Sequence, residues 1–147
     1  MNYNRVILAA FFLVGGIAVV NAQDIHKNNI PKIVKSTFTK QFPAAMDEDW
    51  ELKGANYEVD FDLNKVDHKA IFSEKGKRIS FQKDIPNTKL PVKISKSIKE
   101  KYPKGRIDDV DLINTNGKIT YKIDIEGVPD VNVWYESSGK FIKEVAD

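Results

Sequence analysis

The side chains that could carry chemistry in this chain are few, and the sequence does not group them for catalysis. Cysteine is absent, and the two histidines are His26 and His68. A nucleophile activated by a neighbouring base would therefore have to pair a serine with His68. A zinc site lacks the grouped ligands that the ion requires. We expect no catalytic residue, no metal and no cofactor, and we keep a hydrolytic enzyme that relies on His68 as a second alternative.

Acidic residues gather in two places. The segment from Asp60 to Lys65 begins like a calcium loop, but Lys65 stands where such a loop needs Gly, and Ile71 stands where it needs Glu. A second cluster, where a weak calcium site and plain solvation are both open, consists of Asp108, Asp109 and Asp111. We favour solvation there. The carboxylates along these strands make a small-ligand or cation-binding sensor or carrier the first alternative function.

A glycoside hydrolase would need two carboxylates that face one another across a cleft. Glu58, Asp60 and Asp62 instead alternate along one predicted strand. The sequence shows no apolar walls around them that would raise a pKa for acid catalysis. We do not expect glycosidase activity.

The first 22 residues have the pattern of a secretory signal peptide. Arg5 precedes an uncharged run from Val6 to Val20, and Val20-Asn21-Ala22 supplies a cleavage site of small residues. The run is shorter than the roughly 18 to 20 residues of a membrane-spanning helix. We predict cleavage after Ala22, a secreted or periplasmic protein, and no stable membrane insertion after cleavage.

The charge of the remaining chain excludes one class of partner. Of 23 basic and 21 acidic side chains, only the basic Arg5 falls in the signal segment, which leaves 22 and 21. A domain this close to neutrality, without a block of like charge, is not expected to bind nucleic acid. Because cysteine is absent, stability must come from burial and hydrogen bonds.

The sequence contains an internal repeat. "IPKIVKSTFTKQFP" at residues 30–43 matches "LPVKISKSIKEKYP" at 90–103, an offset of 60. "YEVDF" at 57–61 then matches "YKIDI" at 121–125, and "FSEKGKRI" at 72–79 matches "YESSGKFI" at 135–142. Such self-similarity indicates two copies of one structural unit. We call them repeat 1 (residues 23–86) and repeat 2 (residues 87–147).

Each repeat is predicted to open with a helix, at about 31–42 and about 91–102. Pro suits the first helical turn, where its missing N–H is not needed. Apolar residues step by four in both segments, as in Val34, Phe38 and Phe42, and this places them on one stripe. The next Pro ends each helix.

After each helix the apolar period changes from about 3.6 to 2, which indicates strands. Tight turns at Asn116-Gly117, Lys75-Gly76 and Ser138-Gly139 require antiparallel pairing. The fold class predicted is α+β: two tandem α-β-β-β-β repeats that form a mostly antiparallel sheet with helices packed on one face. The predicted strands are Trp50 to Lys53, Asn56 to Leu63, Asp67 to Ser73, Lys77 to Gln82, Asp109 to Asn114, Lys118 to Glu126, Asp130 to Glu136 and Lys140 to Val145.

These patterns carry a family resemblance. An exported chain with tandem units of a Pro-led helix ending in "FP" or "YP", an aromatic-aliphatic strand pair and a closing "GK.I" strand resembles the PepSY-like family, which is related in fold to beta-lactamase-inhibitor proteins. The resemblance spans about residues 30–145. It implies an antiparallel sheet covered by helices on one face and a non-catalytic role in recognising or restraining another protein.

The face of the sheet away from the helices is the candidate site. Aligning Phe72 with Tyr135 turns Ile71 and Trp134 away from the helices. Placing Ile142 inward like Ile79 turns Phe141 and Val145 outward alongside Trp134. An apolar patch with a polar rim is typical of a protein interface. The predicted partner-binding residues are Trp134, Phe141, Val145, Ile71 and Glu136, with Asp124 and Glu126 also at the rim.

The function predicted is that of an exported, non-catalytic binding module. It would recognise or inhibit a protein or peptide partner, such as a protease or another envelope protein, through the uncovered sheet face. Burial of the same patch by the N-terminal tail, by the other repeat or by a homodimer is left open.

Overall fold

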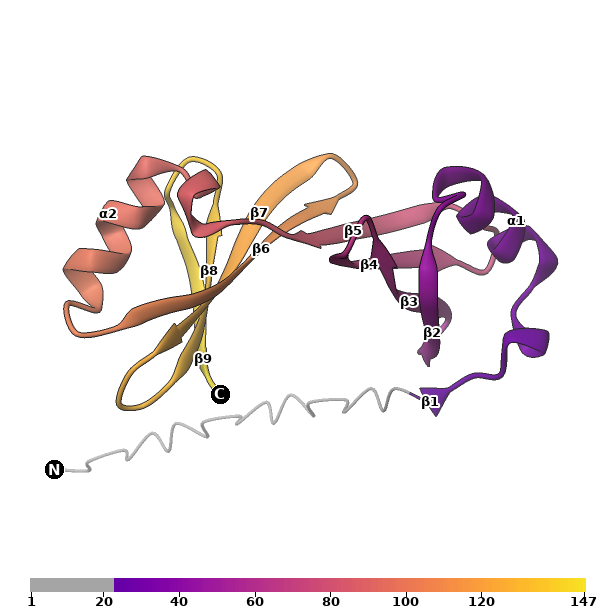
Figure 1. Cartoon of the computed structure of the whole chain (residues 1–147), viewed down its shortest axis with the longest axis horizontal. Coiled ribbons are helices and arrows are strands. Elements are labelled where there is room, and N and C mark those ends of the chain that lie inside the picture. The colour runs from indigo at the N-terminus through magenta and orange to yellow at the C-terminus, as the bar shows by residue number, and fades with distance from the viewer. Residues whose placement is uncertain (1–22) are drawn as a thin grey trace, which may run out of the picture.

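The structure is a computed structural model that describes residues 23–147. It confirms the α+β class: one sheet of nine antiparallel strands in chain order, β1 to β9, with two α-helices (Figure 1). The predicted signal peptide, residues 1–22, lies outside the described residues. The strands are β1 Gln23–Asp24, β2 Met46–Lys53, β3 Asn56–Leu63, β4 Val66–Ser73, β5 Arg78–Asp84, β6 Arg106–Thr115, β7 Lys118–Glu126, β8 Val131–Glu136 and β9 Phe141–Ala146.

The two helices, α1 (Lys32–Gln41) and α2 (Val92–Lys101), form for the same local reasons. Each follows a Pro with extended backbone, and each ends at an aromatic residue whose N–H donates to the carbonyl four residues earlier: Phe42 to Phe38, and Tyr102 to Ile98. A short 3-10 turn precedes each one, η1 (Lys27–Asn29) and η2 (Asn87–Lys89). No helix in residues 23–147 is long and apolar enough to cross a membrane.

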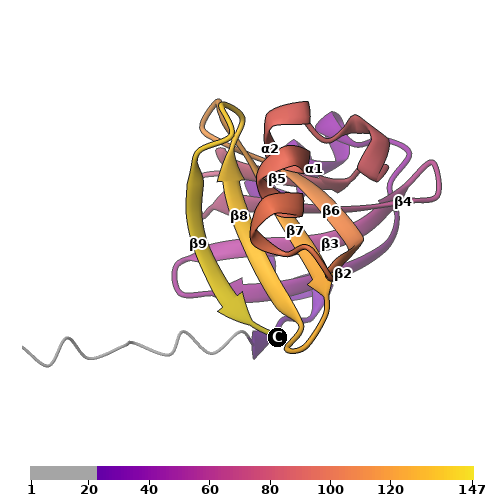
Figure 2. The same ribbon diagram turned by 90° about the vertical axis from the view of Figure 1, so that its left-hand side faces the viewer.

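Both helices lie on one face of the sheet. The repeats join where β5 pairs antiparallel with β6. Phe81, on the helix-covered face of repeat 1, lies opposite Asn114 of repeat 2, and this pairing has no register shift, so the same face of the sheet continues from one repeat into the other. Figure 1 shows the helices toward opposite ends of the molecule, and Figure 2 shows them both on its upper side. The opposite surface of the sheet, which we call the open face, is therefore continuous across the two repeats.

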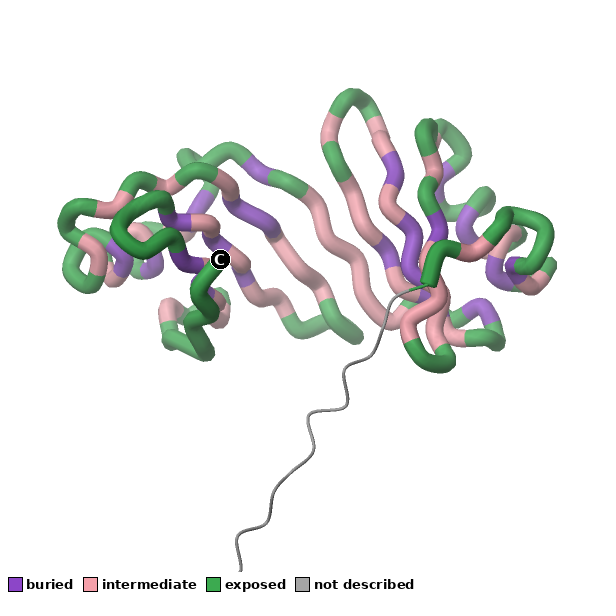
Figure 3. Tube along the Cα trace, turned by 90° about the horizontal axis from the view of Figure 1, so that it is seen from below, coloured by how far each residue is buried: buried purple, intermediate pink, exposed green. Residues whose placement is uncertain are grey.

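Each repeat has a hydrophobic core of its own, and Figure 3 shows buried segments in both halves of the molecule. In repeat 1 the core is aromatic: the Phe38 ring is 1% exposed and lies 5.0 Å from the Phe61 ring and 5.2 Å from the Trp50 ring. In repeat 2 the core is mostly aliphatic. The buried hydrophobic residues of the repeat 1 core are Ile30, Val34, Phe38, Phe42, Trp50, Val59, Phe61, Ala70 and Phe72. Those of the repeat 2 core are Leu90, Ile94, Ile98, Val110, Tyr121, Ile123, Ile125, Val131, Val133 and Tyr135, together with Ile85 from the end of repeat 1.

Candidate functional site

The open face is built by the alternation of side chains along strands β2 to β9. Residues directly opposite in an antiparallel sheet point to the same face, so the register gives its rows directly. One row crosses both repeats from Glu58 through Ile71 and Ser80 to Thr115. A second row begins at Asp84, near the end of repeat 1, and crosses repeat 2. It continues with Asp111, Lys122, Trp134 and Lys143.

Trp134 lies on the open face, as predicted. It is half-buried between Lys122 of β7 and Lys143 of β9, and the Lys143 Nζ lies 4.1 Å from the centre of a Trp134 ring. A lysine over an indole face is a cation-π contact, which restrains the ring and places a charged group beside an apolar one. An indole held in this way is already ordered before a partner arrives, so binding costs less side-chain entropy.

Two other predicted residues share this face with Trp134. Val145 lies opposite Asn132 at the outer strand and is 47% exposed. Glu136 lies opposite Thr120, and its Oε1 is 2.8 Å from Lys118 Nζ. The structure thus brings Trp134, Val145 and Glu136 together on strands β8 and β9.

Ile71 also lies on the open face, but in repeat 1, beside a buried carboxylate. Its neighbour across the strand pair is Glu58, which is 3% exposed. Lys53 and Lys69 both donate to Glu58 Oε1, the latter at 2.9 Å. Burial alone would raise the pKa of Glu58, but these two hydrogen bonds and charges outweigh it and lower that pKa below its usual value.

Repeat 2 carries the opposite charge at the corresponding place. The offset of 64 between β3 and β7 puts Lys122 where repeat 1 has Glu58. Lys122 Nζ lies 3.1 Å from Asp124 Oδ1 and 4.0 Å from Asp111 Oδ2. Burial raises the pKa of Asp111, and burial together with the charge of Asp84 raises the pKa of Asp109.

The two charged groups are separated by an uncharged band where the repeats meet. Its side chains come from β5, β6 and β7 and are half-buried or exposed: Ser80, Gln82, Ile113, Thr115 and Thr120. The open face therefore has a neutral centre, a cluster around an anionic residue on one side, and a cluster around a cationic residue beside an indole on the other.

The prediction that Phe141 lies on the open face is wrong. A bulge shifts the register between β8 and β9, so that Trp134 pairs with Lys143 but the next residue, Tyr135, pairs with Phe141. One extra residue in a strand reverses the faces of the side chains beyond it. The Phe141 ring accordingly lies on the helix side, 5.6 Å from the Tyr135 ring and 3.8 Å from Lys101 Nζ of α2.

His68, the residue on which an enzymatic alternative would depend, lies on the helix side of β4. Its Nδ1 is 2.7 Å from the Val66 carbonyl oxygen, and its ring packs 5.5 Å from the rings of Phe61 and Phe81. These are the contacts of a packed histidine. Within residues 23–147, no group of three or more His, Cys, Asp or Glu side chains is placed to hold a metal ion.

Comparison with known proteins gives the family. The family described as beta-lactamase-inhibitor-like, PepSY-like matches this chain twice, over residues 18–80 and 55–143. The chain belongs to the PepSY-like family. The match confirms the resemblance seen in the sequence. A search of curated proteins gives no match.

Solved structures with the same fold come from Bacteroides species. A periplasmic protein of Bacteroides eggerthii is similar with a TM-score of 0.73, at 16% identity over 79% of this chain and 88% of that one. A DUF2874 family protein of Bacteroides uniformis gives 0.70 at 17% identity, with the same two coverages. A protein of Bacteroides fragilis described as BLIP-like gives 0.64 at 18% identity over 78% and 84%. At these identities the likeness shows the fold.

Sequence reasoning missed the buried Glu58, the Lys143 that covers Trp134, and Glu144 of β9. A usable signal existed in the comparison of the repeats. The offset of 64 pairs Glu58 with Lys122, and the offset of 63 pairs Phe81 with Glu144. Both are changes of chemistry at positions that the fold keeps in the same place.

Proposed function

We propose that this PepSY-like protein is an exported, non-catalytic binding module that holds a protein partner on its open face. The observation that carries the proposal is the continuous open face, which no helix among residues 23–147 covers and which presents Trp134 beside Lys143 at one end. A half-buried indole with a charged rim is the kind of anchor that protein interfaces use.

The charges of the open face support a folded protein surface as partner. Glu58 with its two lysines and Lys122 with its two aspartates offer both signs of charge on either side of the neutral band. A partner with complementary charges would be set in one register along the sheet, because like charges brought together cost free energy. A protease or another envelope protein has a surface broad enough for this role.

Export is part of the same proposal. It rests on the signal-peptide pattern that precedes Gln23 and on the periplasmic description of a protein with this fold. A protein without cysteine can fold in that compartment, since both of its cores are complete without disulfides.

A capture experiment tests the proposal. The protein and its Trp134→Ala and Phe141→Ala variants would be immobilised, incubated with the native exported fraction and analysed by mass spectrometry. Phe141→Ala is the matched control, because it removes an aromatic ring from the helix side of the neighbouring strand. We expect one protein to be retained by the unchanged chain and by Phe141→Ala but lost with Trp134→Ala. Equal recovery on all three would contradict the proposal.

A further inference from the structure

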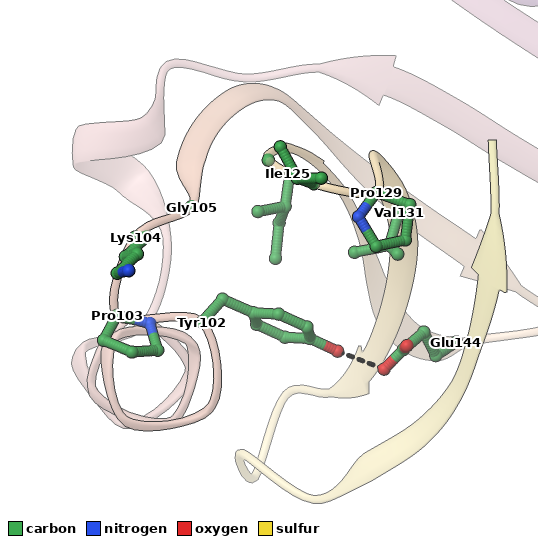
Figure 4. Close-up of a pocket in the computed structure, with 10 residues that line it drawn as sticks. Tyr102, Pro103, Lys104, Gly105, Ile125, Pro129, Val131 and Glu144 are labelled. Atoms are coloured by element: carbon green, nitrogen blue, oxygen red, sulfur yellow. Dashed lines mark hydrogen bonds between the residues drawn. The ribbon is translucent and has the colours of Figure 1, made fainter.

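A cavity on the helix side of repeat 2 has no counterpart of the same composition in repeat 1. It has a volume of about 610 Å³ and opens between the end of α2 and the loop that joins β7 to β8. That volume is in the range of small-molecule sites. Figure 4 shows the Tyr102 ring along one side, with Ile125, Pro129 and Val131 across from it and Glu144 beside the Tyr102 hydroxyl.

Repeat 1 fills the corresponding space with its own aromatic rings. Phe42 stacks on Phe81 with ring centres 5.5 Å apart and planes 10° apart, and it also lies 4.8 Å from Phe61. His68 closes the group at 5.5 Å from both Phe61 and Phe81. Four rings thus occupy this end of repeat 1.

Repeat 2 keeps one of these rings and replaces the other three by smaller or non-aromatic side chains. By the repeat offsets of 60, 64 and 63, Phe42 corresponds to Tyr102, Phe61 to Ile125, His68 to Val131 and Phe81 to Glu144. The loop above them is also longer, because Gly127 to Asp130 replaces the two-residue turn of Asn64 and Lys65. The cavity is therefore the space of rings that repeat 1 has and repeat 2 lacks.

Glu144 decides what kind of ring fits. Its Oε2 accepts hydrogen bonds from Tyr102 Oη and from Lys101 Nζ, the latter at 2.7 Å. Within the described residues its Oε1 has no hydrogen-bond partner, so it can accept one from a ligand. Because Lys101 already balances the charge of Glu144, a neutral donor fits better than a second cation.

We propose that this cavity binds an aromatic ring that carries a neutral N–H or O–H donor, such as an indole or a phenol. The ring would stack on Tyr102 as Phe81 stacks on Phe42, and its donor would reach Glu144 Oε1. The cavity is on the face opposite Trp134, so this inference stands apart from the partner proposed for the open face. The ring can belong to a free small molecule or to a Trp or Tyr side chain of a peptide.

Indole is the probe, and N-methylindole, which lacks the donor, is its matched control. The protein, labelled with nitrogen-15 and recovered from the exported fraction, would be titrated with each of the two compounds at millimolar concentrations while its amide NMR signals are followed. We expect indole to shift the signals of Gly105, Ile125 and Gly127, and N-methylindole to bind several-fold more weakly. A short peptide with a central Trp distinguishes the sources: tighter binding than indole assigns the ring to a peptide, and weaker binding assigns it to a small molecule.

Two variants of one residue make the test specific. Glu144→Phe restores the phenylalanine that repeat 1 has at this place, and its side chain would occupy the cavity. It should weaken indole binding about tenfold or more, because the indole would no longer be buried. Glu144→Gln keeps the shape and should weaken it only a few-fold. Glu100→Phe adds the same ring on an exposed part of α2 and should change nothing. Indole that shifts no signal at the cavity, or that binds Glu144→Phe and the unchanged protein equally, would overturn the proposal.

Discussion

The replacement Glu58→Gln tests the electrostatic account of the open face. It keeps the size of the side chain but removes the charge that Lys53 and Lys69 surround. A hydrogen bond to a charged group contributes about 1.5–3 kcal/mol net. The two lysine side chains are about one third exposed and can turn to water after the change, and both bonds use the same oxygen. We therefore expect a loss of about 2 kcal/mol of unfolding free energy for the pair together, near the lower end of that range.

The pH dependence of this loss has a definite sign. The folded-state pKa of Glu58 is lowered from its ordinary value of 4.5, so its contribution is complete above that value and is lost as the pH falls through the folded-state pKa. The gap in stability between the unchanged protein and Glu58→Gln should therefore be full near neutral pH and shrink in acid.

Urea unfolding followed by circular dichroism, at neutral pH and at about pH 3, measures both effects. A loss of about 2 kcal/mol should lower the melting temperature by roughly 6–10 °C in a chain of this size. Glu51→Gln is the matched control, because this side chain is more exposed and lies 3.7 Å from Lys53. It should change stability by less than about 1 kcal/mol. A Glu58→Gln protein as stable as the unchanged one at neutral pH, or a gap that does not shrink in acid, would refute the reasoning.

Two further predictions follow from burial. Phe38→Ala removes the ring at the centre of the repeat 1 core and should cost about 3–5 kcal/mol in urea unfolding, and a loss below about 1 kcal/mol would show that the core repacks. Asp111→Asn should raise the melting temperature at neutral pH, because burial raises the folded-state pKa of Asp111 and its charged form is therefore destabilising. That gain should vanish as the pH falls below the unfolded-state value, and a lower melting temperature at neutral pH would contradict it.

The helices and the strand pairing could be predicted because each depends on local pattern. The stripe of Val34 and Phe38 gives α1, and the alternation in residues 57–63 gives β3, whose observed bounds equal the predicted ones. The strands that differ most are β2 and β6, which begin several residues earlier than predicted. There, bulges near Asp47 and Asp108 interrupt the alternation on which a prediction depends.

The candidate site was predictable only in part, for a related reason. Trp134 and Ile71 lie in regular stretches of their strands, so the alternation of side chains along a strand placed them correctly on the open face. Phe141 comes directly before a bulge in β9, and sequence alone does not show on which residue a bulge falls. The comparison of the repeats marks Glu58 as a change of charge, but its burial depends on two lysines from different strands, and the sequence does not show that they meet there.

The sharpest test of the central claim is the affinity of the captured partner for the protein and for its Trp134→Ala variant, measured by calorimetry under one salt condition. If Trp134 anchors the partner on the open face, its loss should cost about 2 kcal/mol or more, which weakens binding roughly thirtyfold, while Phe141→Ala binds as the unchanged protein does. An affinity for Trp134→Ala within about twofold of the unchanged protein would place the partner elsewhere and contradict the account.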